Sequence, residues 1–145
     1  MAVTRLYEIL DEKGGDVLEI DADASVFEAV QKMVEMNVGS LLVTEGGDIT
    51  GIVTERDYLR RVTLEGRTDR ETPVREIMSS PLIVASRETT IDECMAVMSD
   101  RRIRHVPVVE DGNVVGLVSI GDLVKFKSKL QTFEIQYLTN YITAG

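Results

Sequence analysis

The chain has 145 residues, with 25 acidic and 16 basic side chains and a formal net charge of −9. One cysteine, Cys94, cannot form an internal disulfide, and one histidine, His105, excludes zinc motifs that need two, so no metal site is expected. The negative charge argues against a nucleic-acid binder, whose affinity comes mainly from attraction to phosphates. No apolar run approaches the about 20 residues of a membrane span, and the N-terminus lacks a signal-peptide pattern. We therefore expect a cytoplasmic protein without membrane contact, although a removed transit peptide would leave no trace.

The first elements in chain order are a helix and a β-α-β-β-α unit. The helix spans 3–13, with Leu6, Ile9 and Leu10 on one face. A capping box, in which a hydroxyl and a carboxylate satisfy the free amides of a helix start, marks where the unit's first helix begins. The unit is predicted as a strand at 17–20, a helix from Ser25-x-x-Glu28, strands at 41–44 and 49–53 joined by Gly46-Gly47, and a helix from Thr54.

The second half of the chain repeats this unit. Residues 15–59 align with 80–124 at a constant offset of 65, without a gap, and Asp57 matches Asp122. Cys94 falls on the apolar stripe of a predicted helix, which indicates a small core residue. The second unit is predicted as a strand at 82–84, a helix from Thr90-x-x-Glu93, strands at 106–109 and 114–118 joined by Asp111-Gly112, and a helix from Ser119.

These elements predict an α/β (α+β) fold with tandem β-α-β-β-α repeats. Neither repeat is long enough to close a core alone, so the two sheets are expected to pack face to face. Apolar residues in the C-terminal stretch, among them Phe126, Leu130, Phe133, Tyr137, Leu138 and Tyr141, indicate either a cover for the core or a self-association surface. The predicted organisation is an N-terminal helix at 1–14, repeat 1 at 15–61, a linker and lead-in at 62–79, repeat 2 at 80–128 and a C-terminal helix or tail at 129–145.

Both repeats contain a motif that can cap a helix or bind a ligand. Gly51-Ile-Val-Thr-Glu-Arg-Asp57 and Gly116-Leu-Val-Ser-Ile-Gly-Asp122 place a hydroxyl and a carboxylate where a strand runs into a helix. A carboxylate there can accept hydrogen bonds from a diol such as ribose, and a helix start attracts anions. The same spacing forms a capping box with Asp in place of Glu. Taken alone, the spacing favours the cap, because a cap explains both copies without a ligand.

Basic residues gather near the strand that begins at Val106. Arginine suits phosphate oxygens, but such residues also pair with carboxylates on a solvated face. For Arg101 and Arg102, which end a predicted helix, the solvated face is favoured, while for Arg104 and His105 both interpretations stay open. No nucleophile, base and oxyanion donor converge, so no catalytic residue is assigned. Three further basic residues, Arg56, Arg60 and Arg61, lie on the predicted second helix of repeat 1.

Three stretches carry a family resemblance. Residues 73–81 (Pro-Val-Arg-Glu-Ile-Met-Ser-Ser-Pro), 89–95 (Thr-Thr-Ile-Asp-Glu-Cys-Met) and 103–122 closely resemble the cystathionine β-synthase (CBS) domain family. The first repeat matches more loosely. The resemblance implies a stand-alone Bateman module, in which two pseudo-twofold-related repeats leave two clefts between their sheets and the module forms a homodimer. It further implies binding of adenosine ligands (AMP, ADP, ATP, S-adenosylmethionine or NAD(H)) and regulation of a partner enzyme or transporter.

The family pattern also implies two sets of ligand-binding residues, each drawn from both repeats. Gly39-Ser40 stands where the other repeat has Arg104-His105, which argues against a polyphosphate in the second cleft. We call the sets after their acidic residues. The Asp57 cleft comprises Ile52, Thr54, Arg56, Asp57, Met78, Ile83, Ile103, Arg104 and His105, and the Asp122 cleft comprises Lys13, Leu18, Val38, Gly39, Ser40, Leu117, Ser119, Gly121 and Asp122.

Three functions follow from these patterns. The leading one is a sensor that binds an adenosine nucleotide as a regulatory ligand and modulates a partner by rearranging. The second is a structural or dimerisation module with empty clefts. The third, an enzyme, is the weakest because no catalytic constellation is present.

We expect the Asp57 cleft to bind a charged nucleotide more tightly than the Asp122 cleft, which would hold a weaker nucleotide or an uncharged adenosine moiety. Asp57→Ala should therefore reduce the affinity for ATP more than Asp122→Ala, as measured by calorimetry. Equal ATP affinities of the two variants would contradict this ranking.

Overall fold

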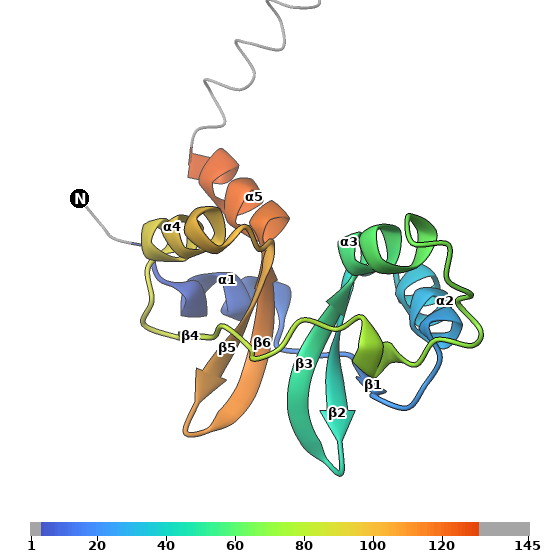
Figure 1. Cartoon of the computed structure of the whole chain (residues 1–145). Coiled ribbons are helices and arrows are strands. Elements are labelled where there is room, and N and C mark those ends of the chain that lie inside the picture. Colours follow the sequence, from blue (N-terminus) through green and yellow to red (C-terminus); the bar gives the residue numbers. More distant parts are fainter. Residues whose placement is uncertain (1–3, 131–145) are drawn as a thin grey trace, which may run out of the picture. The chain divides into compact units, whose positions relative to one another are not determined.

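The structure, a computed structural model, describes residues 4–130. The chain divides into two compact units, each with its own core. Asp16–Ile83 forms the repeat-1 unit, and Met1–Gly15 with Val84–Gly145 forms the repeat-2 unit (Figure 1). The N-terminal helix thus belongs with the second repeat. The predicted tail with Phe133, Tyr137, Leu138 and Tyr141 lies outside the described residues.

The repeat-1 unit is a three-stranded sheet with helices on one face (Figure 1). Its strands run in the order β1-β2-β3, with β1 parallel and β3 antiparallel to β2. The helix α3 continues into a π-helical turn. The elements are β1 (Glu19–Asp21), α2 (Val26–Met36), β2 (Ser40–Glu45), β3 (Asp48–Thr54), α3 (Glu55–Tyr58), the π-helical turn (Leu59–Thr63) and a 3₁₀ helix (Val74–Glu76).

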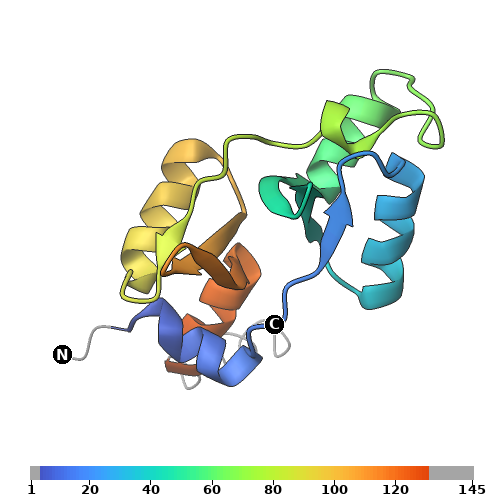
Figure 2. The ribbon, with the colours of Figure 1, turned by 90° about the horizontal axis from the view of Figure 1, so that it is seen from below.

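The repeat-2 unit has the same topology, with strand order β4-β5-β6 and the same directions. The additional helix α1 packs against α5 and β6, and Figure 2 shows it beside α5. The hairpin register is also repeated, because His105 pairs with Ser119 as Ser40 pairs with Thr54. The elements are α1 (Leu6–Lys13), β4 (Ala85–Ser86), α4 (Ile91–Arg101), β5 (His105–Glu110), β6 (Asn113–Ser119) and α5 (Ile120–Leu130).

Local chemistry starts the helices and turns the hairpins at the predicted residues. The capping box predicted at Ser25 is only half formed, because the Ser25 hydroxyl accepts a hydrogen bond from the Glu28 amide at 3.1 Å but the Glu28 carboxylate does not bond back to the Ser25 amide. Thr90 forms the full reciprocal capping box with Glu93. The first hairpin turns at Gly46 and Gly47, with φ of 59° and 89°. The second uses Asp111 and Gly112 with φ of 51° and 79°. Two successive positive φ values are what a tight two-residue hairpin requires.

Each unit buries its own apolar cluster beneath its helices. Cys94 lies in the repeat-2 cluster, and burial raises the pKa of its thiol to about 11, so it is a neutral core residue as predicted. On α2, Val26, Ala29 and Met33 are buried, at the spacing of one helix face. The repeat-1 cluster is Ala22, Val26, Ala29, Met33, Leu41, Val43, Val53, Val62, Val74 and Ile77, and the repeat-2 cluster is Leu6, Ile9, Leu10, Ile91, Cys94, Met98, Val106, Val108, Val118 and Leu123.

One local prediction is wrong. The strand predicted at 82–84 lies instead at Ala85–Ser86, because pairing with Val108 and Val109 fixes the strand rather than the apolar run. The stretch 62–72, within the predicted linker, also packs on the repeat-1 helices. Val62 and Thr72 are buried, and the carbonyl of Thr72 accepts the first amide of α2 at 2.8 Å. This segment is thus part of the repeat-1 unit.

The predicted α/β fold with two β-α-β-β-α repeats and an N-terminal helix is confirmed. The face-to-face packing of the sheets stays a prediction. Among residues 4–130, no helix combines the length and the apolar character needed to span a bilayer.

Candidate functional site

The Thr54–Asp57 and Ser119–Asp122 motifs form the same reciprocal cap. The Thr54 amide donates to Asp57 Oδ2 at 2.9 Å, and the Asp57 amide donates to Thr54 Oγ1 at 3.2 Å. The corresponding distances in the repeat-2 unit are 2.8 and 3.1 Å. The structure therefore confirms the cap. It does not exclude a ligand, because a carboxylate has about four lone-pair positions and each cap engages only Oδ2.

In the repeat-1 unit, the second oxygen of Asp57 faces a residue that sequence reasoning missed. The Ser79 hydroxyl lies 3.5 Å from Asp57 Oδ1, which is a weak contact. Backbone hydrogen bonds between Ser79 and Ile52 hold this segment against β3. Arg61 also lies near, and its guanidinium donates to the carbonyls of Ile77 and Met78. The signal for Ser79 was its place in the stretch 73–81 that resembles the family.

The two carboxylates differ in electrostatic environment. Burial raises the pKa of Asp57 and outweighs the opposing hydrogen bonds from Thr54 and the charge of Arg61. Burial also favours a raised pKa at Asp122, but the ammonium of Lys13, 2.5 Å from Oδ2, and the bonds from Ser119 outweigh it and lower the pKa. No ion pair to Asp57 is present among residues 4–130. Of the two cap carboxylates, Asp57 is thus the one without a contacting cation in the described part of the chain.

His105 lies close to the acidic residue of its own repeat. Its strand position pairs with Ser119, and its pKa is lowered by burial, with the charge of Asp122 opposing this shift. Burial therefore disfavours the imidazolium form, which makes His105 a weaker source of positive charge than an arginine. Arg104 is exposed and keeps its charge, so it is the cation of the Arg104-His105 pair.

Each unit holds residues of both predicted clefts. In the repeat-1 unit, Ser40 of the Asp122 cleft lies opposite Thr54 of the Asp57 cleft. The pairing of these sets across the units stays a prediction. The repeat-1 unit carries Leu18, Val38, Gly39, Ser40, Ile52, Thr54, Arg56, Asp57, Met78 and Ile83, and the repeat-2 unit carries Lys13, Ile103, Arg104, His105, Leu117, Ser119, Gly121 and Asp122.

The arginines at the end of α4 lie on an exposed face, as the sequence predicts. Arg101 is in the last turn and contacts Asp100 at 3.5 Å, where both side chains are largely exposed. Arg102 caps the helix in the left-handed region, with φ of 56°. These residues serve the helix end, where a cation is favourable.

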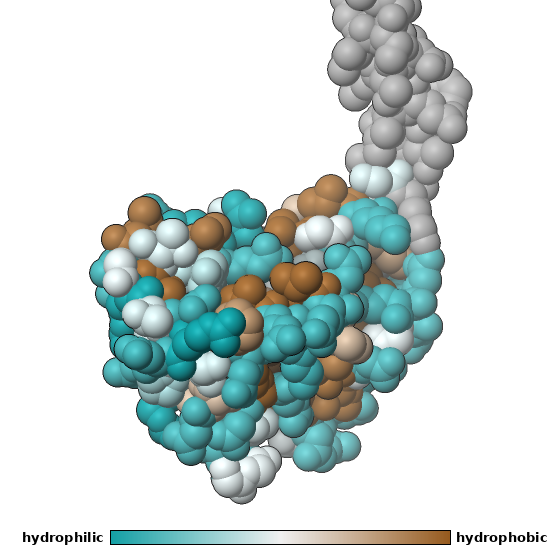
Figure 3. Space-filling view, turned by 90° about the vertical axis from the view of Figure 1, so that its right-hand side faces the viewer, coloured by the Kyte–Doolittle hydropathy of each residue, from teal (hydrophilic) through white to brown (hydrophobic). Residues whose placement is uncertain are grey.

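The helices of the repeat-1 unit leave an apolar groove of about 380 Å³. Val34 and Leu59 are 74% and 55% exposed beside it, and Figure 3 shows apolar patches among hydrophilic side chains on the face seen from this unit's side. The corresponding position to Val34 in the other repeat is Ser99. At this one position, repeat 1 is therefore apolar where repeat 2 is polar. Val30, Met33, Val34, Asn37, Val38, Glu55, Tyr58 and Leu59 line the groove.

Comparison with known proteins agrees with this architecture. The CBS domain model matches residues 8–64 and 74–129, one match for each repeat. The chain belongs to the CBS domain family. It is 38% identical to the mitochondrial CBS domain-containing protein CBSX3 of Arabidopsis thaliana, over 98% of this chain and 73% of the relative.

For two further relatives, the matched region covers most of the relative's own length. The CBS domain-containing protein YhcV of Bacillus subtilis is 34% identical, over 81% of this chain and 84% of the relative. The structure of a putative signal-transduction protein with CBS domains from Burkholderia ambifaria is 42% identical with a TM-score of 0.81, over 84% and 92% of the two chains. Pairs of CBS domains are generally regulatory, non-catalytic modules.

The contrast between the two carboxylates predicts opposite effects of removing their charge. Asparagine keeps an oxygen that can accept the cap bonds. The raised pKa of Asp57 means that its charged form is less favourable in the folded chain than in the unfolded chain. Its charge therefore destabilises the fold once the pH rises above about 3.9, the usual pKa of an aspartate. We expect Asp57→Asn to be at least as stable as the wild type at pH 7, with a difference that vanishes near pH 3.

Asp122→Asn is the matched change. Because the pKa of Asp122 is lowered, its contribution is complete above about pH 3.9 and is lost as pH falls through its folded value. The variant should be less stable at pH 7 by up to about 1 kcal/mol, and the deficit should disappear in acid. Urea unfolding at both pH values measures this, and an equal deficit in the two variants would contradict it.

Proposed function

We propose that the chain is a regulatory module that binds an adenosine nucleotide of the AMP, ADP or ATP type and modulates a partner enzyme or transporter. Membership of a family of regulatory modules supports the general role. Ligand binding would act by favouring one of two arrangements of the repeats or subunits, to the extent that the ligand's affinity differs between them.

The observation that carries the proposal is the state of Asp57. Its carboxylate is partly buried, its pKa is raised, and its Oδ1 meets only the distant Ser79 hydroxyl among the described residues. A buried carboxylate without a contacting cation costs stability, which is a recognised mark of a functional group. Two vicinal hydroxyls are neutral donors that can satisfy such an acceptor, which favours ribose as the ligand's contact with Asp57.

A thermal-shift and calorimetric panel tests the proposal with AMP, ADP, ATP, S-adenosylmethionine and NADH. A nucleotide at 100 times its Kd should raise the free energy of unfolding by about 2.7 kcal/mol. Asp57→Asn should lose most of this gain, because an amide accepts a diol less well while the cap remains. Preference for S-adenosylmethionine or NADH would replace the nucleotide assignment. The absence of any response would leave a structural module, and turnover of a nucleotide would indicate an enzyme.

The family resemblance also supports a homodimer, and the groove on the repeat-1 helices offers a surface for a second copy. Val34 and Leu59 expose apolar area that a monomer would leave in water. Val34→Glu should therefore lower the mass measured by light scattering towards that of one chain. Ser99→Glu places the same charge at the corresponding position of repeat 2 and should not change the mass. A dimer that withstands Val34→Glu would contradict this surface.

A further inference from the structure

The caps of the two units are alike, but one position beside them differs. Lys13 and Met78 are related by the repeat offset of 65. In the repeat-2 unit, Lys13 Nζ donates to Asp122 Oδ2 at 2.5 Å and to the Leu117 carbonyl at 2.8 Å. In the repeat-1 unit, Met78 packs so closely on Gly51 that a Cβ added to this glycine would lie 2.7 Å from Met78 Sδ. The thioether of Met78 carries no charge, so it cannot form an ion pair with Asp57.

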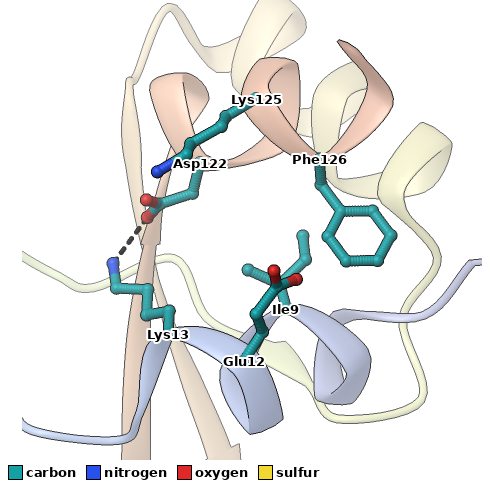
Figure 4. A pocket seen from close by; sticks show the side chains of 6 residues that line it. All are labelled: Ile9, Glu12, Lys13, Asp122, Lys125 and Phe126. Carbon is teal, nitrogen blue, oxygen red and sulfur yellow. Dashed lines mark hydrogen bonds and ion pairs between the residues drawn. The ribbon is translucent and has the colours of Figure 1, made fainter. Parts of the chain in front are cut away.

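Lys13 holds Asp122 beside an open space. A cavity of about 250 Å³ between α1 and α5 is lined by both residues and also by Ile9, Glu12, Lys125 and Phe126 (Figure 4). The side chains of Lys13 and Asp122 are 37% and 24% exposed, so solvent and small molecules can reach the pair. The same lysine contacts the carboxylate that, by the proposed function, would bind a sugar hydroxyl.

The cap and Lys13 both engage Oδ2 of Asp122, so a ligand hydroxyl that bonds to Oδ1 finds an ammonium beside the carboxylate. A neutral diol carries no charge that could attract this ammonium. A ligand that also carries a phosphate supplies a second anion for the lysine, whose flexible stem lets it reach towards the phosphate.

We propose that Lys13 gives the Asp122 site a preference for anionic over neutral adenosine ligands, a contribution that Met78, its counterpart by the repeat offset, cannot make at the Asp57 site. This inference rests on the proposed function. Of the two expectations for the Asp122 cleft, a weaker nucleotide or an uncharged adenosine moiety, it favours the nucleotide.

The test compares adenosine with AMP at each site separately. Amide chemical shifts of Ser119 and Gly121 report the Asp122 site, and those of Thr54 and Asp57 report the other. In Lys13→Met, the ratio of the adenosine Kd to the AMP Kd at the Asp122 site should fall at least about five-fold, the scale of a partly exposed ion pair. Met78→Lys should raise the same ratio at the Asp57 site.

Two controls separate the contact from general charge. Lys125→Met removes an exposed lysine of the same cavity and should leave the ratio unchanged, while Lys13→Arg should retain the preference for AMP. An unchanged ratio in Lys13→Met, or an equal fall in Lys125→Met, overturns the inference but leaves the proposed function intact. If neither ligand shifts any of these amides in the wild type or in Lys13→Met, both fail.

Discussion

The reciprocal cap at the end of each hairpin is the constraint on which the candidate site depends. It joins the last residue of a strand to the third residue of the next helix, so the carboxylate cannot rotate away from the strand end. The cap uses one oxygen of Asp57 and one of Asp122. The same side chain can therefore hold the helix start and still accept a hydrogen bond from a ligand. The cap and ligand interpretations do not compete.

Around this shared cap, the repeats differ in charge. In the repeat-1 unit the carboxylate contacts the Thr54 hydroxyl and, weakly, the Ser79 hydroxyl, Arg61 lies near without an ion pair, and burial raises the pKa of the carboxylate. In the repeat-2 unit a lysine from α1 supplies the balancing charge. Since α1 packs only in the repeat-2 unit, the added N-terminal helix is the source of this asymmetry. Equivalent backbones thus place the two carboxylates in different electrostatic environments.

Much of the fold could be predicted because the repeat offset transfers every inference from one half to the other. The helix starts at Ser25 and Thr90, the buried Cys94 and both hairpins follow from local spacing. The strand predicted at 82–84 failed because a two-residue parallel pairing is set by its partner strand and leaves no pattern of its own. The packing of the stretch 62–72 was missed because backbone carbonyls, which the sequence does not distinguish, make its contacts with α2.

The candidate site was predictable in residue type but not in electrostatic state. The family resemblance assigns Lys13 and Asp122 to the same cleft, yet only folding brings the lysine of α1 to the carboxylate of α5 across 109 positions. Burial lowers the pKa of His105, and the charges of Lys13 and Arg104 act in the same direction, against that of Asp122. A basic cluster in the sequence therefore contributes less positive charge than its composition indicates. The charge around each cap carboxylate is therefore set by which cations reach it in the folded chain, and this is not visible in the composition.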